Sequence, residues 1–242
     1  MDRKGVKLSI KGLSVSYEKT LVLDRIGLRA TDGEFVAIVG ESGCGKTTLL
    51  GAIAGFLDFD GRITAPKRIG VVFQDHAVFP WLTVAGNIRF GLKEKSKTLD
   101  YYLKMTGIED KKDRYPFQLS GGEAQRVALA RTLAADLDLI LMDEPYGSLD
   151  IYTRERMQRW LLDVWEKEKK TVLMVTHSID EAILLADRVL VMRDKKIVAE
   201  FKVPFKRPRD WKIKFEKRFV DLTQDISTAI SDWASRPVSR ES

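Results

Sequence analysis

The sequence predicts an α/β fold, and three features of the 242-residue chain indicate it. Short apolar runs alternate with longer segments of helical periodicity, which is the pattern of an α/β protein. Several of the runs are apolar at every position, as in parallel strands that helices cover on both faces. The composition, 44% hydrophobic and 31% charged, is that of a globular chain that can bury a sizeable core.

The first elements of the chain predict a small antiparallel β portion. Apolar and polar residues alternate in VKLSIKGLSVSY, residues 6–17, and again in LVLDRIGLRA, residues 21–30. Alternation with a period of two residues is typical of strands with one buried face and one exposed face. We therefore expect an antiparallel portion at the amino terminus of the core.

The strands of the main sheet are predicted from five apolar runs. The first run, FVAIV at residues 35–39, is followed at once by a glycine-rich turn and the helix-like segment KTTLLGAIAG. The other runs are IGVVF, LDLILM, TVLMVT and RVLVM, at residues 69–73, 137–142, 171–176 and 188–192. Their apolar character on both faces predicts a largely parallel sheet covered by helices.

The region between about residues 83 and 131 predicts a separate helical unit. It is mostly helix-like, with breaks at Gly107 and Pro116, and no run in it has the character of a strand. We expect one domain with an α/β core at about 1–82 and 136–205. An inserted α-helical subdomain at about 83–135 and a basic carboxyl-terminal extension at about 206–242 complete the expected organisation.

A glycine-rich loop, GESGCGKTT, fits the pattern G-x-x-x-x-G-K-[ST] from Gly40 to Thr47. Its glycines allow consecutive backbone N–H groups to converge on phosphate oxygens, beside the amino end of a helix. Lys46 supplies a positive charge for the β- and γ-phosphates, and the Thr47 hydroxyl can ligate Mg²⁺. The full expected nucleotide contact of the loop is Gly40, Glu41, Ser42, Gly43, Cys44, Gly45, Lys46, Thr47 and Thr48.

Two acidic residues end the apolar run LDLILMDEP. In doubly wound sheets ligands bind at the carboxyl ends of the strands, which is where Asp143 and Glu144 are expected. Adjacent carboxylates at the end of a buried strand are costly unless a cation or a reaction uses them. We expect Asp143 to hold Mg²⁺ through water and Glu144 to polarise an attacking water.

A second anion site is predicted at LSGGEAQRVALARTL, residues 119–133. Ser120, Gly121 and Gly122 offer a hydroxyl and backbone N–H groups at the start of a helix with an apolar stripe. One nucleotide is not easily grasped by two sites that lie on different subdomains of one chain. We therefore expect a head-to-tail pair in which each copy offers its Ser120 loop to the γ-phosphate held by the other.

In this order, the motifs resemble those of the ATP-binding subunit of an ATP-binding-cassette (ABC) transporter, over about residues 6–200. The resemblance implies a P-loop NTPase (RecA-like) core that binds ATP and Mg²⁺ and hydrolyses ATP. It implies that Tyr17 stacks on adenine and that Gln74 senses both Mg²⁺ and the attacking water. It also implies that His177 contacts the γ-phosphate and that Asp150, in the SLD loop, contacts the second copy. Glu144, His177 and Gln74 are thus the expected catalytic set, and Thr47, Gln74 and Asp143 the expected metal set.

The segment FQDHAVFPWLTVAGNI predicts a partner. Phe79, Pro80 and Trp81 follow Gln74 and form a plausible apolar docking face for a helix of an integral-membrane permease. VFPWLTV, MDEPYGSLD and THSIDEAILLADRV resemble importer subunits for nitrate, taurine and aliphatic sulfonates. That resemblance implies an indirect partnership with a solute-binding protein and a peripheral position on the cytoplasmic side of the cell (inner) membrane.

Charge and cysteine content limit the other classes of function. A single cysteine excludes a disulfide framework and fits a reducing compartment, and neither a membrane-spanning run nor a secretory signal is apparent. Eight Lys or Arg and two acids lie between Lys202 and Arg218, which accounts for the net charge of +6. This segment is interpreted as a solvated face over Trp211, Phe215 and Phe219, with an anionic membrane or nucleic acid as the alternative ligand.

Four alternatives to the importer subunit differ in their expected features. An ABC ATPase that acts off the membrane commonly carries two cassettes or long insertions, and an exporter subunit would differ in the direction of transport. A nucleotide-binding module without turnover would lack the acid or the histidine, yet Glu144 and His177 are present. A GTPase is disfavoured because no N-K-x-D tetrapeptide occurs. No nucleic-acid partner is expected.

Overall fold

The computed structural model describes residues 5–73, 78–93, 97–147 and 149–231. Over these residues the main sheet has the strand order β5-β6-β7-β3-β8-β9. All neighbouring strands in it are parallel except β8 and β9, which are antiparallel. The strand bounds are β3 Phe35–Val39, β5 Ile69–Val72, β6 Leu139–Asp143, β7 Thr171–Thr176, β8 Arg188–Arg193 and β9 Lys196–Lys202.

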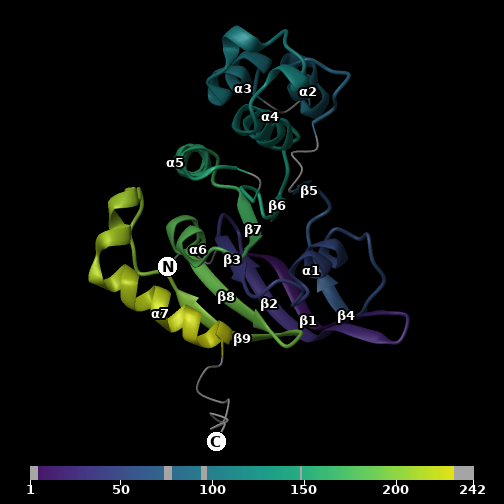
Figure 1. Ribbon diagram of the computed structural model, residues 1–242. Coiled ribbons are helices and arrows are strands. Elements are labelled where there is room, and N and C mark those ends of the chain that lie inside the picture. Colours follow the sequence, from purple (N-terminus) through teal and green to yellow (C-terminus); the bar gives the residue numbers. More distant parts are fainter. Residues whose placement is uncertain (1–4, 74–77, 94–96, 148, 232–242) are drawn as a thin grey trace, which may run out of the picture.

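A second, antiparallel sheet of order β2-β1-β4 covers part of the main sheet, as Figure 1 shows. Its strands are β1 Val6–Tyr17, β2 Thr20–Thr31 and β4 Asp60–Thr64. The sequence predicts the first two strands but not β4. The segment DGRIT is short and mostly exposed, so it has no apolar run that would mark it as a strand.

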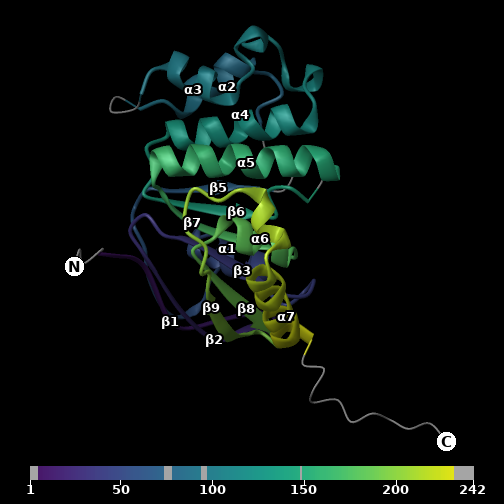
Figure 2. The same cartoon turned by 90° about the vertical axis from the view of Figure 1, so that its left-hand side faces the viewer.

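The helices fall into two groups. α2, α3 and α4 form the helical subdomain, which stands apart from the sheets, with α5 between it and the core (Figures 1 and 2). α1 follows β3 and covers one face of the main sheet, and α6 and α7 cover the other face. The bounds are α1 Lys46–Ile53, α2 Val84–Gly91, α3 Leu99–Thr106, α4 Gly121–Ala134, α5 Ile151–Glu168, α6 Ile179–Leu185 and α7 Lys217–Ser231, with short 3₁₀ helices at Glu109–Lys111, Pro116–Gln118 and Trp211–Phe215.

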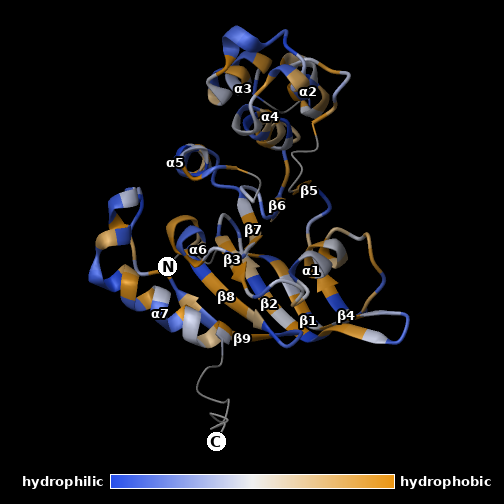
Figure 3. Ribbon diagram, in the orientation of Figure 1, coloured by the Kyte–Doolittle hydropathy of each residue, from blue (hydrophilic) through white to orange (hydrophobic). Residues whose placement is uncertain are grey.

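The main sheet separates two hydrophobic cores, which explains why its strands are apolar on both faces. Along β3, Phe35, Ala37 and Val39 face the core shared with α5, α6 and the helical subdomain. Val36 and Ile38 face the core shared with α1 and the antiparallel sheet. Figure 3 shows the resulting hydrophobic strands in the centre of the molecule. The α/β class, the antiparallel portion and the inserted helices are confirmed.

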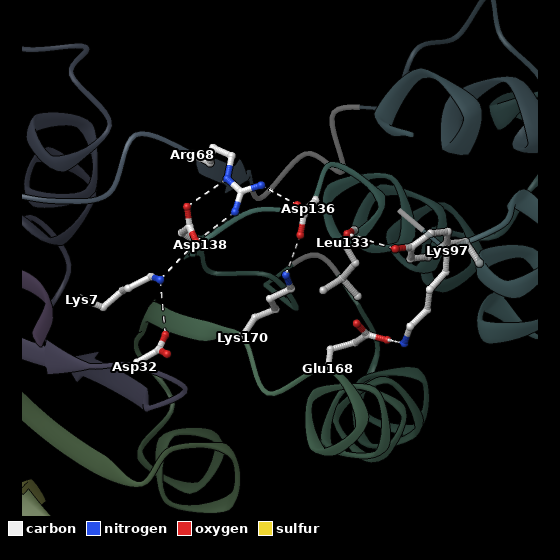
Figure 4. Close-up of polar contacts among 10 residues, drawn as sticks. Lys7, Asp32, Arg68, Lys97, Leu133, Asp136, Asp138, Glu168 and Lys170 are labelled. Carbon is white, nitrogen blue, oxygen red and sulfur yellow. Dashed lines mark hydrogen bonds and ion pairs between the residues drawn. The ribbon is translucent and has the colours of Figure 1, made fainter. Parts of the chain in front are cut away.

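Charged side chains at the amino ends of the parallel strands neutralise one another (Figure 4). Arg68, which precedes β5, binds Asp138, which precedes β6, with an Nε–Oδ2 distance of 3.0 Å. Lys7 binds the same carboxylate at 3.1 Å. The hydrogen bond from Arg68 is the main reason that the pKa of Asp138 is lowered. The charges at this edge of the sheet therefore have partners within the chain.

The interpretation of the basic segment as a solvated face is wrong in part. Arg209 is only 8% exposed, and its Nη1 donates to the carbonyl oxygens of Ile183 and Ala186, at 3.0 and 2.6 Å, where α6 ends. Carbonyl groups at the end of a helix are free to accept and favour a cation. Phe219 is buried as expected, but Phe215 is 75% exposed.

Candidate nucleotide-binding site

The carboxyl ends of β6, β7 and β3, which are neighbours in the main sheet, bring most of the predicted site residues to one edge. Gly40 follows β3, Asp143 is the last residue of β6, and His177 follows β7 directly. Val39 lies opposite Thr176 in the β3–β7 pair, so these strand ends are level. Residues that are far apart in the sequence therefore surround one space.

The loop from Gly40 to Gly45 turns tightly from β3 into α1, and glycine is required at two of its positions. Gly45 has a φ of +107°, and a Cβ there would lie 2.7 Å from Cδ2 of Leu23. A Cβ on Gly40 would lie 2.2 Å from the carbonyl oxygen of Met192. These close approaches hold the amino end of α1 at the loop, where its N–H groups favour phosphate oxygens.

The Lys46 side chain lies inside the loop, with only 6% of the residue exposed. Its Nζ donates to the carbonyl oxygens of Gly40 and Glu41, both at 2.8 Å. The Cys44 sulfur lies 3.9 Å from the same nitrogen. The ammonium group is thus held over the loop by backbone contacts, in position to meet the negative charge of a phosphate chain.

Thr47 and Asp143 form an oxygen-rich pair that fits a hard cation. The Thr47 hydroxyl donates to Oδ1 of Asp143 at 3.2 Å. Burial raises the pKa of Asp143, and the adjacent Glu144 adds to the rise, against the Thr47 hydroxyl and the Lys46 charge. No cluster of three His, Cys, Asp or Glu suited to a metal occurs among the described residues. Mg²⁺ suits such a site because it takes few protein oxygens and completes its shell with phosphates and water.

Glu144 and His177 contact each other, with 3.1 Å between Oε2 and Nδ1. The backbone N–H of Glu144 donates to the carbonyl of Val175 in β7 at 3.0 Å, and the residue has a φ of +42°. This bond anchors the turn after β6 to the neighbouring strand. The two side chains therefore sit together at the same edge as Asp143, with the imidazole 56% exposed.

A cavity of about 180 Å³ opens between the loop and the Glu144 side chain. It is lined by Val22, Ser42, Gly43, Gly45, Lys46, Thr47, Thr48 and Glu144. The sequence does not predict Val22 as a site residue, because an apolar residue in an alternating strand looks like an ordinary core residue. Tyr17, 49% exposed at the end of β1, is not among the lining residues.

Ser120, Gly121 and Gly122 lie elsewhere, at the start of α4 in the helical subdomain. Ser120 accepts the N–H of Glu123 at 3.4 Å, and Glu123 accepts the N–H of Ser120 at 2.9 Å, which is a capping box. Ser120 and Gly122 line a different cavity, of about 100 Å³, against α5. A Cβ on Gly122 would lie 2.6 Å from Cγ2 of Thr153, so this glycine also permits close packing of α4 on α5.

The remaining predicted site residues are distributed as follows. Asp150 caps α5 by accepting the N–H of Thr153 at 3.0 Å. Gln74 and Ser148 lie outside the described residues, so the predicted Gln74 contacts and the first residue of the SLD loop have no structural account.

An apolar groove of about 320 Å³ lies between the edge strand β5 and the helical subdomain. Phe79 and Phe90 line it and stack edge to face, with ring centroids 4.7 Å apart. Asn87 fixes the Phe79 backbone by accepting its N–H at 2.8 Å and donating to its carbonyl at 3.1 Å. The neighbouring Trp81 is 70% exposed and Pro80 is exposed.

These features define the class of protein. A glycine-rich phosphate loop leads from a central strand into a helix, and a hydroxyl, two carboxylates and a histidine stand beside it: this is the nucleotide site of a P-loop ATPase. The sequence matches the ABC transporter family over residues 23–147, and the chain belongs to that family.

The relatives agree with this assignment. An uncharacterised ABC transporter ATP-binding protein of Methanocaldococcus jannaschii is 42% identical, covering 93% of this chain and 94% of its own length. An aliphatic sulfonates import ATP-binding protein of Paracoccus denitrificans is 45% identical, covering 84% and 86%. A solved ATP-binding cassette, described as dimeric and bound to ADP and Pi after hydrolysis, superposes with a TM-score of 0.71. It is 29% identical, over 82% of this chain and all of its own.

As a member of this family the chain is an ABC ATPase subunit that binds and hydrolyses ATP. Among the described residues, no helix has both the length and the apolar character needed to cross a bilayer.

Proposed function

We propose that two copies of this chain form a head-to-tail dimer that hydrolyses Mg·ATP and powers import of a small solute through a membrane permease. We propose further that the solute is an organic sulfonate, taurine or a similarly small anion such as nitrate. The observation that carries the dimer is the separation of two half-sites within one chain. Lys46, Thr47 and Glu144 line one cavity, whereas Ser120 lines another on the helical subdomain.

A second copy related by a twofold axis would bring its Ser120 loop to the γ-phosphate held by the first. In such a pair the Lys46 half-site of each copy meets the Ser120 half-site of the other, so the dimer contains two complete sites. The hydroxyl of Ser120 and the N–H groups of Gly121 and Gly122, at the amino end of α4, suit an anion. The dimeric state described for a similar cassette supports this arrangement. Asp150, at the start of α5, would lie at the same interface.

The chemistry proposed for each site follows from the contacts at the sheet edge. Lys46 and the loop N–H groups neutralise the phosphates, and Glu144, which lines the cavity, contacts His177. Glu144 orients the attacking water and accepts its proton, while His177 stabilises the charge that develops on the γ-phosphoryl group. Positioning and electrostatics supply most of the acceleration in phosphoryl transfer.

Thr47 and Asp143 would hold Mg²⁺, with Gln74 as a further contact outside the described residues. When bound, Mg²⁺ neutralises charge on the β- and γ-phosphates. Tyr17 would stack on the adenine, since its ring is half exposed at the end of β1. Val22, which lines the cavity beside the loop, would make an apolar contact with the same nucleotide.

The groove beside β5 is the proposed docking face for a permease helix. Trp81 and Phe90 are 70% and 65% exposed, and large exposed aromatic residues next to a groove mark an interaction surface. Motion of the helical subdomain during hydrolysis would then reach the permease through Phe79. The chain would lie peripherally on the cytoplasmic face of the cell membrane, and a solute-binding protein would deliver the solute from the other side.

The choice of solute rests on a relative whose name assigns it to aliphatic sulfonate import. The test is to purify the chain with its permease and solute-binding protein, in vesicles, and measure ATP hydrolysis with taurine, an alkane sulfonate or nitrate in turn. Stimulation by one of these, with its uptake, is the expected result. Release of solute in place of uptake would indicate an exporter, and purification without any membrane protein would indicate an ATPase that acts off the membrane.

Docking itself is tested with a matched pair of variants. Trp81→Ala should lose the permease while keeping the ATPase activity of the isolated chain. Phe215→Ala removes an aromatic ring that is equally exposed, at 75%, on a different part of the molecule, and should keep both properties. Equal permease binding by the two variants would contradict the proposed docking face.

A further inference from the structure

The two residues on either side of His177 are joined to Glu181 by a ring of hydrogen bonds. Thr176, the last residue of β7, donates its hydroxyl to Oε2 of Glu181. The same hydroxyl oxygen accepts the N–H of Ser178 at 3.1 Å. The Ser178 hydroxyl in turn accepts the N–H of Glu181 at 3.3 Å. The backbone after His177 is therefore bonded to the Thr176 hydroxyl, and that hydroxyl is bonded to the Glu181 side chain.

The His177 side chain takes no part in these hydrogen bonds. It is 56% exposed, and its imidazole contacts Glu144. The hydrogen bonds of Thr176, Ser178 and Glu181 fix the backbone that carries this side chain.

We propose that Glu181 is a positioning residue for His177: it fixes the turn between β7 and α6 so that the imidazole meets Glu144 and the γ-phosphate. This inference rests on the proposed role of His177 in hydrolysis. Glu181 touches neither nucleotide nor water in this account and acts through the turn alone.

The burial of Glu181 supports a specific role for its carboxyl group. The residue is 4% exposed, and burial raises its pKa although Thr176, Arg154, Gln158 and His177 all favour the charged form. Its second oxygen, Oε1, is buried and has no hydrogen-bond partner among the residues that the structure describes. A buried carboxyl group with one oxygen unsatisfied is unfavourable for stability. Packing alone therefore does not account for a glutamate here.

The charge of Glu181 also acts on the segment that follows Glu144. Tyr146, two residues after Glu144, is 1% exposed. Its burial raises the pKa of its phenol, and the negative charge of Glu181 raises it further. Gln158 of α5 is 3% exposed and also favours the charged form of the Glu181 carboxyl group.

The first test removes the hydroxyl that links the turn to Glu181. Thr176→Val keeps the shape of the side chain and should lower kcat for ATP roughly tenfold, with little change in KM, because small displacements of reacting groups are costly. Thr171→Val is the matched control. Thr171 begins the same strand, is equally buried at 1%, and its hydroxyl accepts the N–H of Gly33 at 2.9 Å. It should lose stability but keep kcat within about twofold.

The second test asks whether the effect passes through His177. In a His177→Ala background, Thr176→Val should lower kcat by no more than about twofold further, since coupled residues are not additive. Glu181→Gln retains an oxygen that accepts the Thr176 hydroxyl, so it should keep most of the kcat that Glu181→Ala loses. If Thr176→Val does not fold, the comparison of kcat between Glu181→Gln and Glu181→Ala still tests the positioning role.

The outcomes separate the two proposals. If His177→Ala turns over ATP at the wild-type rate, the proposed role of His177 fails. If His177→Ala is impaired but Thr176→Val matches Thr171→Val, or adds its full loss in the His177→Ala background, the positioning role of Glu181 is wrong. The positioning role is supported if Thr176→Val lowers kcat in the wild-type background but not further in the His177→Ala background, and if Glu181→Gln keeps the kcat that Glu181→Ala loses.

Discussion

The two halves of the nucleotide site are held in different ways. On the core side, Lys46 is bonded to its own loop and Thr47 to Asp143, at the edge of a sheet that is buried on both faces. On the other side, Ser120 is held by a capping box with Glu123 at the start of α4, in the helical subdomain. One half therefore lies at the edge of the main sheet, and the other lies on the helical subdomain.

The helical subdomain is joined to α5 by polar contacts and by a shared hydrophobic core. Trp160 of α5 donates to the carbonyl of Met105 at 2.7 Å, and Lys97 binds Glu168 at 2.7 Å (Figure 4). α4 lies on α5 where Gly122 meets Thr153 (Figure 2). The comparison teaches that the phosphate-binding half is preorganised by the main sheet. The completing half lies on the helical subdomain, whose apolar residues share one core with α5 and the main sheet.

The largest effect is expected on the core side. Glu144→Gln keeps the size of the side chain but removes the group that accepts a proton, so ATP turnover should fall at least about a hundredfold. Nucleotide binding should persist, because Lys46 and the loop are unchanged. Phosphate release and equilibrium nucleotide binding measure the two properties separately, and turnover near the wild-type rate would contradict the assignment.

A pair of glycine substitutions contrasts the two halves directly. Gly45→Ala introduces a side chain at a φ of +107° and against Leu23, which should weaken ATP binding by the isolated chain about thirtyfold, from roughly 2 kcal/mol of strain. Gly122→Ala meets Thr153 and should leave that binding unchanged while it lowers turnover. Titration of each variant with nucleotide checks this. Equal binding defects would mean that both halves contact ATP within one chain.

Ser120→Ala should lower turnover about tenfold through loss of a hydroxyl that meets the γ-phosphate. The same change also removes a helix cap, which costs about 1 kcal/mol of stability. Thr98→Ala is the control, since Thr98 caps α3 in the same subdomain by accepting the N–H of Tyr101 at 3.3 Å. Thermal denaturation should shift alike for both variants, whereas only Ser120→Ala should lose activity. A similar loss in both would make Ser120 a cap and nothing more.

The smallest effect concerns the fastening of the helical subdomain. Burial would raise the pKa of Glu168, but bonds from Lys97 and Tyr101 outweigh it and lower the pKa below the ordinary value of 4.5. The carboxylate therefore stabilises the fold fully above that value, and the contribution disappears as the pH falls through the lowered pKa. Glu168→Gln should cost about 1 kcal/mol at neutral pH. Urea unfolding should show this difference vanish in acid, and a difference that persists there would contradict the role of the charge.

The parts of the fold that the sequence predicts are those with local patterns. Strands such as β3 and β7 are apolar at every position because two cores meet across them, and the phosphate loop is a contiguous motif. β4 escapes prediction because its partner β1, not its own residues, makes it a strand. Arg207 and Arg209 escape because a run of charges is ordinarily solvated. Here Arg207 lies 4.0 Å from the centre of the Trp165 ring, and Arg209 caps α6, which only the tertiary structure reveals.

The site residues also fall into those that a local sequence pattern predicts and those that only the tertiary structure reveals. Lys46, Thr47, Asp143 and Glu144 are predicted because each belongs to a contiguous motif at or after the end of an apolar run that forms a strand of the main sheet. Val22 looks like any strand residue, and Gly122 looks like a donor of backbone N–H groups alone. Its second property, close approach to Thr153, depends on the packing of α4 against α5.

The central claim, that each nucleotide is completed by a second copy, is tested most directly by mixing two inactive chains. Lys46→Ala damages only the core half, and Ser120→Arg only the helical half. In mixed dimers one site receives both changes and the other receives neither. Mixing equal amounts should restore roughly a quarter of the wild-type turnover, because half of the dimers are mixed and each contains one complete site. Turnover that stays at the level of the separate variants would contradict the account.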